Sequence, residues 1–151
     1  MPILTTPTAA LRYETSGDPA HPPLVLLHGA METFEACWKK PLPALAERHF
    51  VVGLDLRGHG QSSNTLDGLD TRQMADDVAA LLDALGLAQA HVAGFSAGAS
   101  VALYFALRHP GRRARHPPPP HGDLSGCDSV VFAERVSGAP GARASCPRGR
   151  R

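Results

Sequence analysis

The sequence predicts an α/β fold for residues 1–111, with a parallel sheet and helices on its faces. Three short apolar runs, at 24–27, 50–54 and 90–95, lack polar alternation, which is typical of strands covered on both faces. Segments with helical periodicity separate these runs along the chain. Strands that alternate with helices favour parallel pairing through right-handed crossovers.

The first elements in chain order have weaker signals. Residues 11–15 alternate apolar and polar side chains, and a Gly-Asp-Pro turn at 17–19 ends the segment. We expect this segment to be an extra strand, antiparallel at one edge of the sheet. Residues 33–48 have helical character, but Pro41 and Pro43 must interrupt the helix, since proline lacks an N–H and clashes with the preceding turn.

Two further helices follow the second buried run. Asp70 or Thr71 can cap the first, and Gly86 can stop it. Its apolar positions form a single stripe: Met74, Val78, Leu81, Leu82 and Leu85. Residues 97–109 are small and apolar and end before Pro110, which predicts a buried helix.

The character of the chain changes after Gly111. Residues 1–111 carry a net charge of −4 and residues 112–151 a net charge of +5. Apart from a short apolar run at 129–133, the second segment has no periodicity and is rich in Arg, Pro and Gly. We therefore divide the chain into an N-terminal α/β part, residues 1–111, and a tail, residues 112–151.

Three interpretations of the tail stay open. It could be translated out of frame, because GC-rich codons read in a wrong frame encode Arg, Pro, Gly, Ala and Ser. It could be a disordered, solvated tail without a role. It could also be a basic arm for nucleic acid, but it has no lysine, no interleaved aromatic side chains and no binding motif, so nucleic acid is the least favoured partner.

Composition narrows the function classes. With 43% hydrophobic and 19% charged residues, the chain matches an ordinary globular protein. No apolar run approaches the roughly 18 residues of a membrane span, and the first residues lack a signal sequence, so we expect a cytoplasmic protein without membrane contact. Three distant cysteines, Cys37, Cys127 and Cys146, have no metal spacing, and we expect neither a metal nor another cofactor.

The strongest chemical motif is the sequence from Gly94 to Gly98, Gly-Phe-Ser-Ala-Gly, which matches G-x-S-x-G where a strand turns into a helix. Such a nucleophile elbow needs small flanking residues, because the serine backbone is strained and the helix passes close to the strand. Ser96 would then present its hydroxyl near the positive end of the following helix. The alternatives are a serine that only caps the helix, and a phosphate loop, which the Ala99-Ser100 continuation disfavours.

Two more motifs follow buried strands: His28-Gly29-Ala30 after the first, and Asp-Leu-Arg-Gly-His-Gly-Gln-Ser at 55–62 after the second. Together with the motif at 94–98, their order and spacing resemble the N-terminal half of the α/β-hydrolase family. The resemblance runs from about residue 11 to residue 110. It implies an α/β-hydrolase-like parallel sheet with flanking helices that is truncated after the helix of the nucleophile elbow.

The resemblance implies roles for individual residues. Ser96 matches the nucleophile, and the backbone N–H groups of Ala97 and Ala30, with Met31 in reserve, match the oxyanion donors. His28 and His59 belong to motifs with structural roles, where loop-fixing hydrogen bonds are expected. A serine at the elbow disfavours the dehalogenase and epoxide-hydrolase branches, which place an aspartate there.

The chain departs from the family downstream of Ser96. In this family the order is serine, then acid, then histidine. Here every later histidine precedes every later acid; these residues are His109, His116, His121, Asp123, Asp128 and Glu134. His109 also ends the predicted helix at 97–109, roughly 20 Å from its start at 1.5 Å per residue. No triad base or orienting acid is therefore identified.

The functional expectation follows from these observations. The chain resembles a serine hydrolase that acts by acyl transfer on a small ester, thioester, lactone or amide, and we expect this chain to be weakly active or inactive. The alternative is a non-catalytic binding or assembly protein on the same fold. The resemblance implies further parallel strands beyond the strand at 90–95, but nothing after Pro110 clearly supplies the next one, and the short run at 129–133 is the only candidate. Without it, the strand at 90–95 should be an open edge, with apolar Val101, Tyr104 and Phe105 exposed beside it, and self-association is expected there.

Overall fold

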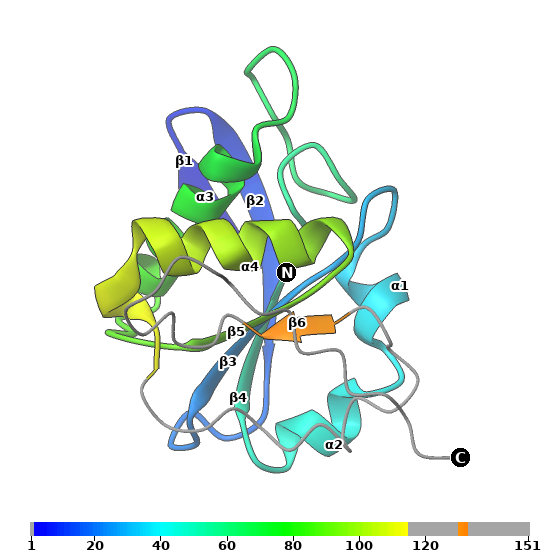
Figure 1. The fold of residues 1–151 in the computed structure, drawn as a ribbon. Helices are drawn as coiled ribbons and strands as arrows, with labels where there is room; N and C mark the ends of the chain where they lie inside the picture. Colours follow the sequence, from blue (N-terminus) through cyan, green and yellow to red (C-terminus); the bar gives the residue numbers. More distant parts are fainter. Residues whose placement is uncertain (1, 115–129, 133–151) are drawn as a thin grey trace.

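The structure is a computed structural model that describes residues 2–114 and 130–132, and the backbone alone for 130–132. It contains one six-stranded sheet in the order β1-β2-β4-β3-β5-β6 (Figure 1). The elements are β1 (Ile3–Thr6), β2 (Ala9–Ser16), β3 (Pro23–Leu27), α1 (Phe34–Trp38), α2 (Leu42–Ala46), β4 (Phe50–Leu54), α3 (Thr71–Ala84), β5 (His91–Phe95), α4 (Ala97–Arg108), a 3-10 helix (Pro110–Arg112) and β6 (Val130–Phe132).

The three apolar runs form the centre of the sheet, as predicted. β3 pairs in parallel with both β4 and β5, and Leu24 lies opposite Val51 on one side and His91 on the other. The sheet is nevertheless mixed, because β1, β2 and β6 run antiparallel to their neighbours. The carboxyl ends of β3, β4 and β5 lie at one edge, where loops that carry chemistry gather in parallel sheets.

One strand position was predicted wrongly. The segment around residues 11–15 is antiparallel to β4, as expected, but it is not at the edge of the sheet, because β1 pairs with its other side. β1 has four residues, none of them buried, and it reaches the sheet through a tight turn. A strand so short and so exposed has almost no periodic signal.

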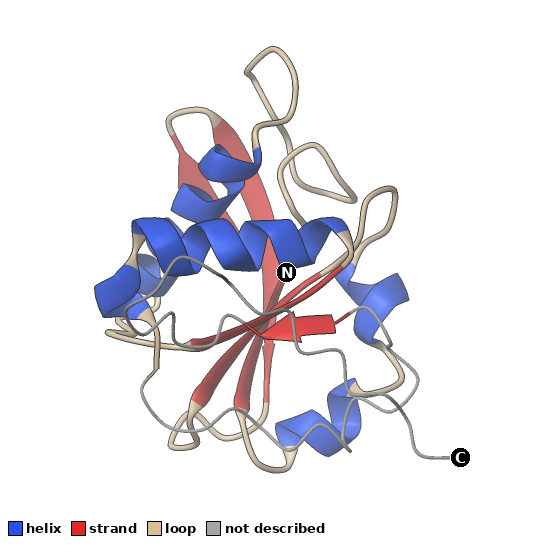
Figure 2. Cartoon of the chain, viewed as in Figure 1, coloured by secondary structure: helices blue, strands red, loops and turns tan. Residues whose placement is uncertain are grey.

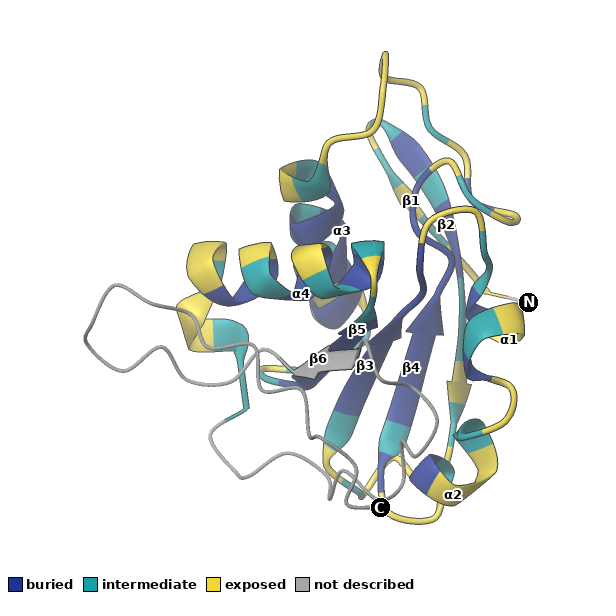
Figure 3. Cartoon of the chain, turned by 45° about the vertical axis from the view of Figure 1, so that its right-hand side comes forward, coloured by how far each residue is buried: buried dark blue, intermediate teal, exposed yellow. Residues whose placement is uncertain are grey.

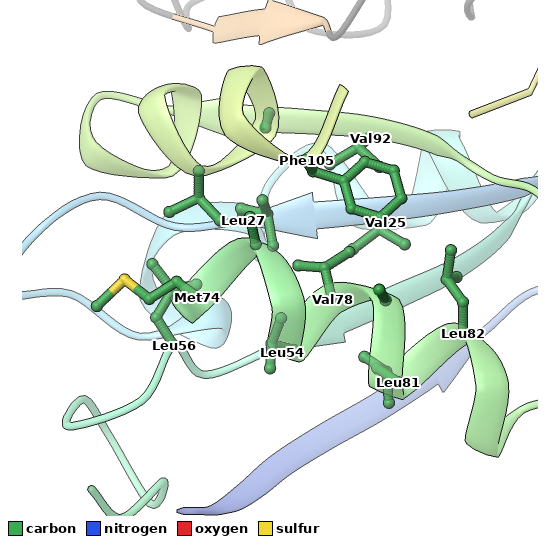
Figure 4. Packing of buried hydrophobic residues seen from close by; sticks show 14 of the residues in the cluster. Val25, Leu27, Leu54, Leu56, Met74, Val78, Leu81, Leu82, Val92 and Phe105 are labelled. Atoms are coloured by element: carbon green, nitrogen blue, oxygen red, sulfur yellow. The ribbon is translucent and has the colours of Figure 1, made fainter. Parts of the chain in front are cut away.

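Helices cover both faces of the sheet (Figures 2 and 3). α3 and α4 lie on one face and α1 and α2 on the other, and alternate strand residues point to the two layers. The larger core, shown in Figure 4, joins Val25 and Val92 of the sheet to Val78 of α3 and Phe105 of α4. The smaller core on the opposite face contains Leu24, Leu26, Phe34, Trp38, Leu45, Val51 and Ala93.

The helix predictions are confirmed, including the interruption at the prolines. Thr33 caps α1, and its side chain accepts a hydrogen bond from the N–H of Ala36. Pro41 stands before α2, so residues 33–48 form two short helices in place of one. Asp70 caps α3 by accepting from the N–H of Arg72, and the apolar stripe of α3 packs on the sheet.

The expected open edge is a second correction. The backbone of β6 pairs antiparallel with β5, with Gly94 opposite Val131, and Arg113 forms a parallel bridge to Ala90. The side of β5 that faces away from β3 is therefore paired, with β6 near its carboxyl end and with Arg113 next to its start. The short apolar run at 129–133 was the only candidate for this strand, and its middle residues supply it.

The exposed apolar face of α4 was also predicted wrongly in part. Val101 and Phe105 are 1% and 0% exposed, because α4 turns these side chains toward β5 and α3. Tyr104 is exposed, as expected, and so is Leu107. Self-association stays a prediction, and the tail interpretations concern residues that lie mostly outside the described part of the chain.

Candidate active site

Ser96 lies at the turn between β5 and α4, and it is exposed. Its backbone has φ 51° and ψ −112°, a conformation that non-glycine residues rarely adopt. Such strained conformations cost about 1–3 kcal/mol and persist only where the surrounding structure imposes them. The N–H of Ala99 donates to the carbonyl of Ser96 at 2.9 Å, which starts the helix directly behind the serine.

Two glycines permit this turn. A Cβ atom on Gly94 would collide with the carbonyl oxygen of Gly98, and one on Gly98 would lie 2.5 Å from the carbonyl oxygen of Leu27. The first turn of α4 is thus packed against the ends of β5 and β3, and positions 94 and 98 have no room for a side chain. The requirement for small residues on both sides of Ser96 is confirmed.

The loop after β3 carries the predicted oxyanion residue Ala30. His28, at the start of this loop, is fully buried, and both its ring nitrogens are engaged. The N–H of Leu56 donates to Nε2 at 2.9 Å, so the proton of the neutral ring is on Nδ1, which donates to the carbonyl of Gly29 at 2.7 Å. Burial lowers the pKa of His28 below its usual 6.5, which favours this neutral form. The loop-fixing role expected of His28 is confirmed.

A second side chain joins the loop after β3 to the loop after β4, this time with the acceptor on the loop after β4. Asp55, after β4, accepts from the N–H of Phe34 at 2.8 Å and from the N–H of Gln61 at 3.2 Å. Arg12 of β2 lies 3.5 Å from the same carboxylate and balances its charge. Together with the bond from Leu56 to His28, this contact holds both ends of the loop that contains Ala30.

The loop after β3 lies directly against the elbow. A Cβ atom on Gly29 would lie 2.9 Å from Cδ1 of Phe95, the residue before Ser96. Met31 has a positive φ of 61° and is 96% exposed, so the loop turns outward after Ala30. The structure therefore brings the loops of Ala30 and Ser96 together at one edge of the sheet.

The motif at 55–62 is anchored to α3 by a buried ion pair. Nε and Nη2 of Arg57 each donate to a carboxylate oxygen of Asp77 at 2.7 Å, and both residues are buried. His59, the other motif histidine, has Nδ1 3.0 Å from the carbonyl of Arg57, which agrees with its expected structural role. Sequence reasoning missed Asp77, although a carboxylate within the apolar stripe of α3 was a signal for a buried partner.

Among residues 2–114, no side chain is in position to act as a base for Ser96. His109, at the end of α4, lies with Nε2 2.8 Å from Asp76 of α3. Arg108 donates twice to the same carboxylate and, with His109, holds the pKa of Asp76 below its usual value. This cluster fastens the far end of α4, while within residues 2–114 no side chain hydrogen-bonds to the Ser96 hydroxyl. His116 and His121 lie outside the described residues.

Comparison with known proteins agrees with this geometry. A sequence model described as alpha/beta hydrolase fold matches residues 22–115. The chain belongs to the α/β-hydrolase family. The α/β-hydrolase match extends past Gly111, and the structure agrees, because Ala90 exchanges backbone hydrogen bonds with Arg112 and Ala114.

Individual α/β-hydrolases show how much of the family the chain covers. It is 44% identical over 96 residues to a soluble epoxide hydrolase of Corynebacterium sp., across 64% of this chain and 32% of the relative. A hydrolase from Pseudomonas aeruginosa superposes with a TM-score of 0.72 at 36% identity, over 76% of this chain and 43% of that one. The enol-lactonase from Burkholderia xenovorans gives a TM-score of 0.69 at 29% identity, over 74% and 44%. The chain thus spans less than half the length of these relatives.

Two kinds of site are not found in the described part of the chain. No group of three or more His, Cys, Asp or Glu side chains there could hold a metal ion. No helix within the same residues is long and apolar enough to cross a membrane.

Proposed function

We propose that this chain is part of a serine hydrolase that acts by acyl transfer on a small ester, thioester, lactone or amide, with Ser96 as the nucleophile. The observation that carries the proposal is the positive φ of Ser96 at a turn where positions 94 and 98 have room only for glycine. A serine that merely capped a helix would not need this strain, and the Ser96 side chain makes no capping hydrogen bond.

The oxyanion of the tetrahedral intermediate would be bound by two backbone N–H groups. The N–H of Ala97 follows the nucleophile at the start of α4, and that of Ala30 comes from the loop that His28 and Asp55 hold. Preorganised donors of this kind stabilise the transition state, and removal of one costs about 3–4 kcal/mol. The close packing of Gly29 on Phe95 supports the assignment, because it brings the two loops into contact.

We also expect this chain to have low hydrolase activity. A serine alcohol needs a base to accept its proton and an acid to orient that base. The nearest downstream histidine, His109, is engaged with Asp76 at the opposite end of α4. Without a base, Ser96 retains only what the oxyanion donors provide, which in a triad enzyme is about 10³–10⁴-fold over water.

The names of two relatives support an ester or lactone as the substrate class. One is titled an enol-lactonase, and another, 31% identical, is titled an N-acyl homoserine lactone degrading enzyme. The epoxide-hydrolase name of the Corynebacterium relative is not carried over, because the family resemblance associates that branch with an aspartate where this chain has Ser96. A cytoplasmic location belongs to the proposal and rests on the sequence observations alone.

The alternative is a non-catalytic protein that uses the fold for binding or assembly. The contact between His109 and Asp76 favours it, since it commits the nearest downstream histidine to a structural role. The gene sequence after the codon for Gly111 separates the two candidates. A one- or two-base shift that restores strand–helix periodicity and a late acid–histidine pair favours the hydrolase, and its absence favours the binding protein.

A fluorophosphonate probe tests the nucleophile. We expect slow labelling on a single peptide that contains Ser96, with none in Ser96→Ala. Ser100, four residues further along α4 and also exposed, is the internal control and should stay unlabelled. Equal labelling of Ser96 and Ser100, or no labelling after prolonged incubation, would contradict the proposal.

A further inference from the structure

Glu32 is a carboxylate beside the elbow that no predicted role includes. It lies two residues after Ala30 in the loop that precedes α1. Its Oε2 atom is 3.1 Å from the position that a Cβ atom on Gly29 would take, and the ring of Phe95 is 2.9 Å from the same point. The carboxylate thus lies beside the ring of Phe95, the residue that directly precedes the proposed nucleophile.

The charge of Glu32 is not compensated by the part of the protein that the structure describes. Oε2 is buried and has no hydrogen-bond partner there, although the residue as a whole is half-buried. No arginine or lysine of residues 2–114 forms an ion pair with it. A buried carboxylate oxygen without a donor costs free energy, so such atoms are normally paired.

Other carboxylates of the chain show the contrast. Asp55 and Asp77 are buried, and each has an arginine, Arg12 and Arg57 respectively. Exposed Glu35, three residues after Glu32, pairs with a lysine one turn along. The titratable residue that precedes Glu32 in this loop is His28, whose two ring nitrogens are already used and whose form is neutral.

We propose that Glu32 makes the Ser96 site selective for substrates that carry a primary ammonium group near the scissile carbonyl, and that it excludes anionic substrates. An ammonium group offers three N–H donors and the missing positive charge, and charge-assisted bonds of this kind are about twice as strong as neutral ones. A carboxylate group on the substrate would instead meet a like charge that the protein has left uncompensated. This inference rests on the proposed function, since it assigns the substrate class of the same site.

The test is a pair of small probes that differ in charge, benzylammonium and benzoate, titrated into the ¹⁵N-labelled chain at pH 7. We expect benzylammonium to shift the amide signals of residues 29–33 and 95–97 and to bind at least about tenfold more tightly than benzoate. In Glu32→Gln this preference should vanish, while Glu35→Gln, the matched control, should keep it. Equal affinity of the wild-type chain for both probes, or a preference that survives in Glu32→Gln, would overturn the inference.

A third variant separates this inference from the proposed nucleophile. Ser96→Ala keeps Glu32, so it should bind benzylammonium as the wild-type chain does. If the fluorophosphonate probe fails to label Ser96 and the charge preference is still found, the proposed reaction is wrong and the ammonium site stands. If labelling succeeds and neither probe binds, the ammonium site is wrong and the nucleophile stands.

Discussion

Replacement of His28 by phenylalanine should loosen the loop that carries Ala30 and lower the stability of the whole fold. The ring would be kept, but the N–H of Leu56 and the carbonyl of Gly29 would lose their buried partners. Each buried group left unpaired costs about 1–3 kcal/mol, so the expected loss is about 2–6 kcal/mol. Against a typical stability of about 5–15 kcal/mol, this is a large fraction.

Thermal unfolding followed by circular dichroism measures the effect. At about 2–4 °C per kcal/mol for a chain of this length, the melting temperature should fall by at least about 4 °C. His49→Phe is the control, because the ring of buried His49 has one hydrogen bond among the described residues, 3.2 Å to the carbonyl of Leu45, and its loss should cost roughly half as much. Amide exchange should also accelerate at residues 29–34 in His28→Phe alone. A melting temperature within 2 °C of wild type, with unchanged exchange, would refute the proposed function of the His28 contacts.

The buried ring of His28 also predicts that the stability of the fold depends on pH. Because burial lowers the pKa of His28 in the folded chain below 6.5, the unfolded chain binds more protons between the two values. Stability therefore falls as the pH drops through 6.5 and levels off below the folded pKa of His28. This slope should be smaller in His28→Phe, and equal slopes in the two proteins between about pH 5 and 7 would contradict the assignment.

Three further predictions concern the fold and its assembly. Asp77→Asn leaves a buried arginine uncompensated and should lower the free energy of unfolding in urea by about 3–5 kcal/mol. Asp83→Asn, at an exposed pair on the same helix, should lower it by at most about 1 kcal/mol, and equal losses would refute the role of the buried pair. Gly94→Ala should prevent folding, as judged by amide chemical-shift dispersion, because the added Cβ atom collides with the first turn of α4. Gly111→Ala, whose Cβ atom meets open space, should fold normally, and a well-dispersed spectrum of Gly94→Ala would show that the elbow tolerates a side chain. Although β6 occupies the β5 edge, Tyr104 and Leu107 of α4 are exposed, so light scattering should show dimers or larger species; a compact monomer with a cooperative thermal transition would refute self-association.

The central strands and the elbow were predictable because their signals are local. Buried parallel strands are continuous apolar runs, and the strained serine must have small neighbours, so a few adjacent residues carry the information in each case. β1 escaped prediction for the opposite reason: four half-exposed residues have no pattern to distinguish them from a loop.

The contacts that hold the site were less predictable, because they join residues far apart in sequence. The pairing of Asp77 with Arg57 spans 20 residues, and the bond from Leu56 to His28 spans 28. The position of Asp77 beside the apolar stripe of α3 was a signal that the sequence analysis missed, and it could not have identified Arg57 as the partner. The run at 129–133 was recognised as the one candidate for the strand beside β5, but it is too short to indicate pairing by itself, and it pairs antiparallel where the family resemblance implied further parallel strands.

The most direct test of the central claim, that Ser96 is a nucleophile without a complete triad, is a time course with p-nitrophenyl acetate followed by peptide mass spectrometry. We expect p-nitrophenol release, after subtraction of the spontaneous hydrolysis of the ester, to stop at or below the molar amount of protein. We also expect the acetyl group to be found on Ser96 and to be absent in Ser96→Ala. Acetylation elsewhere with Ser96 unmodified, or sustained turnover at a rate typical of enzymes that Ser96→Ala abolishes, would contradict this claim.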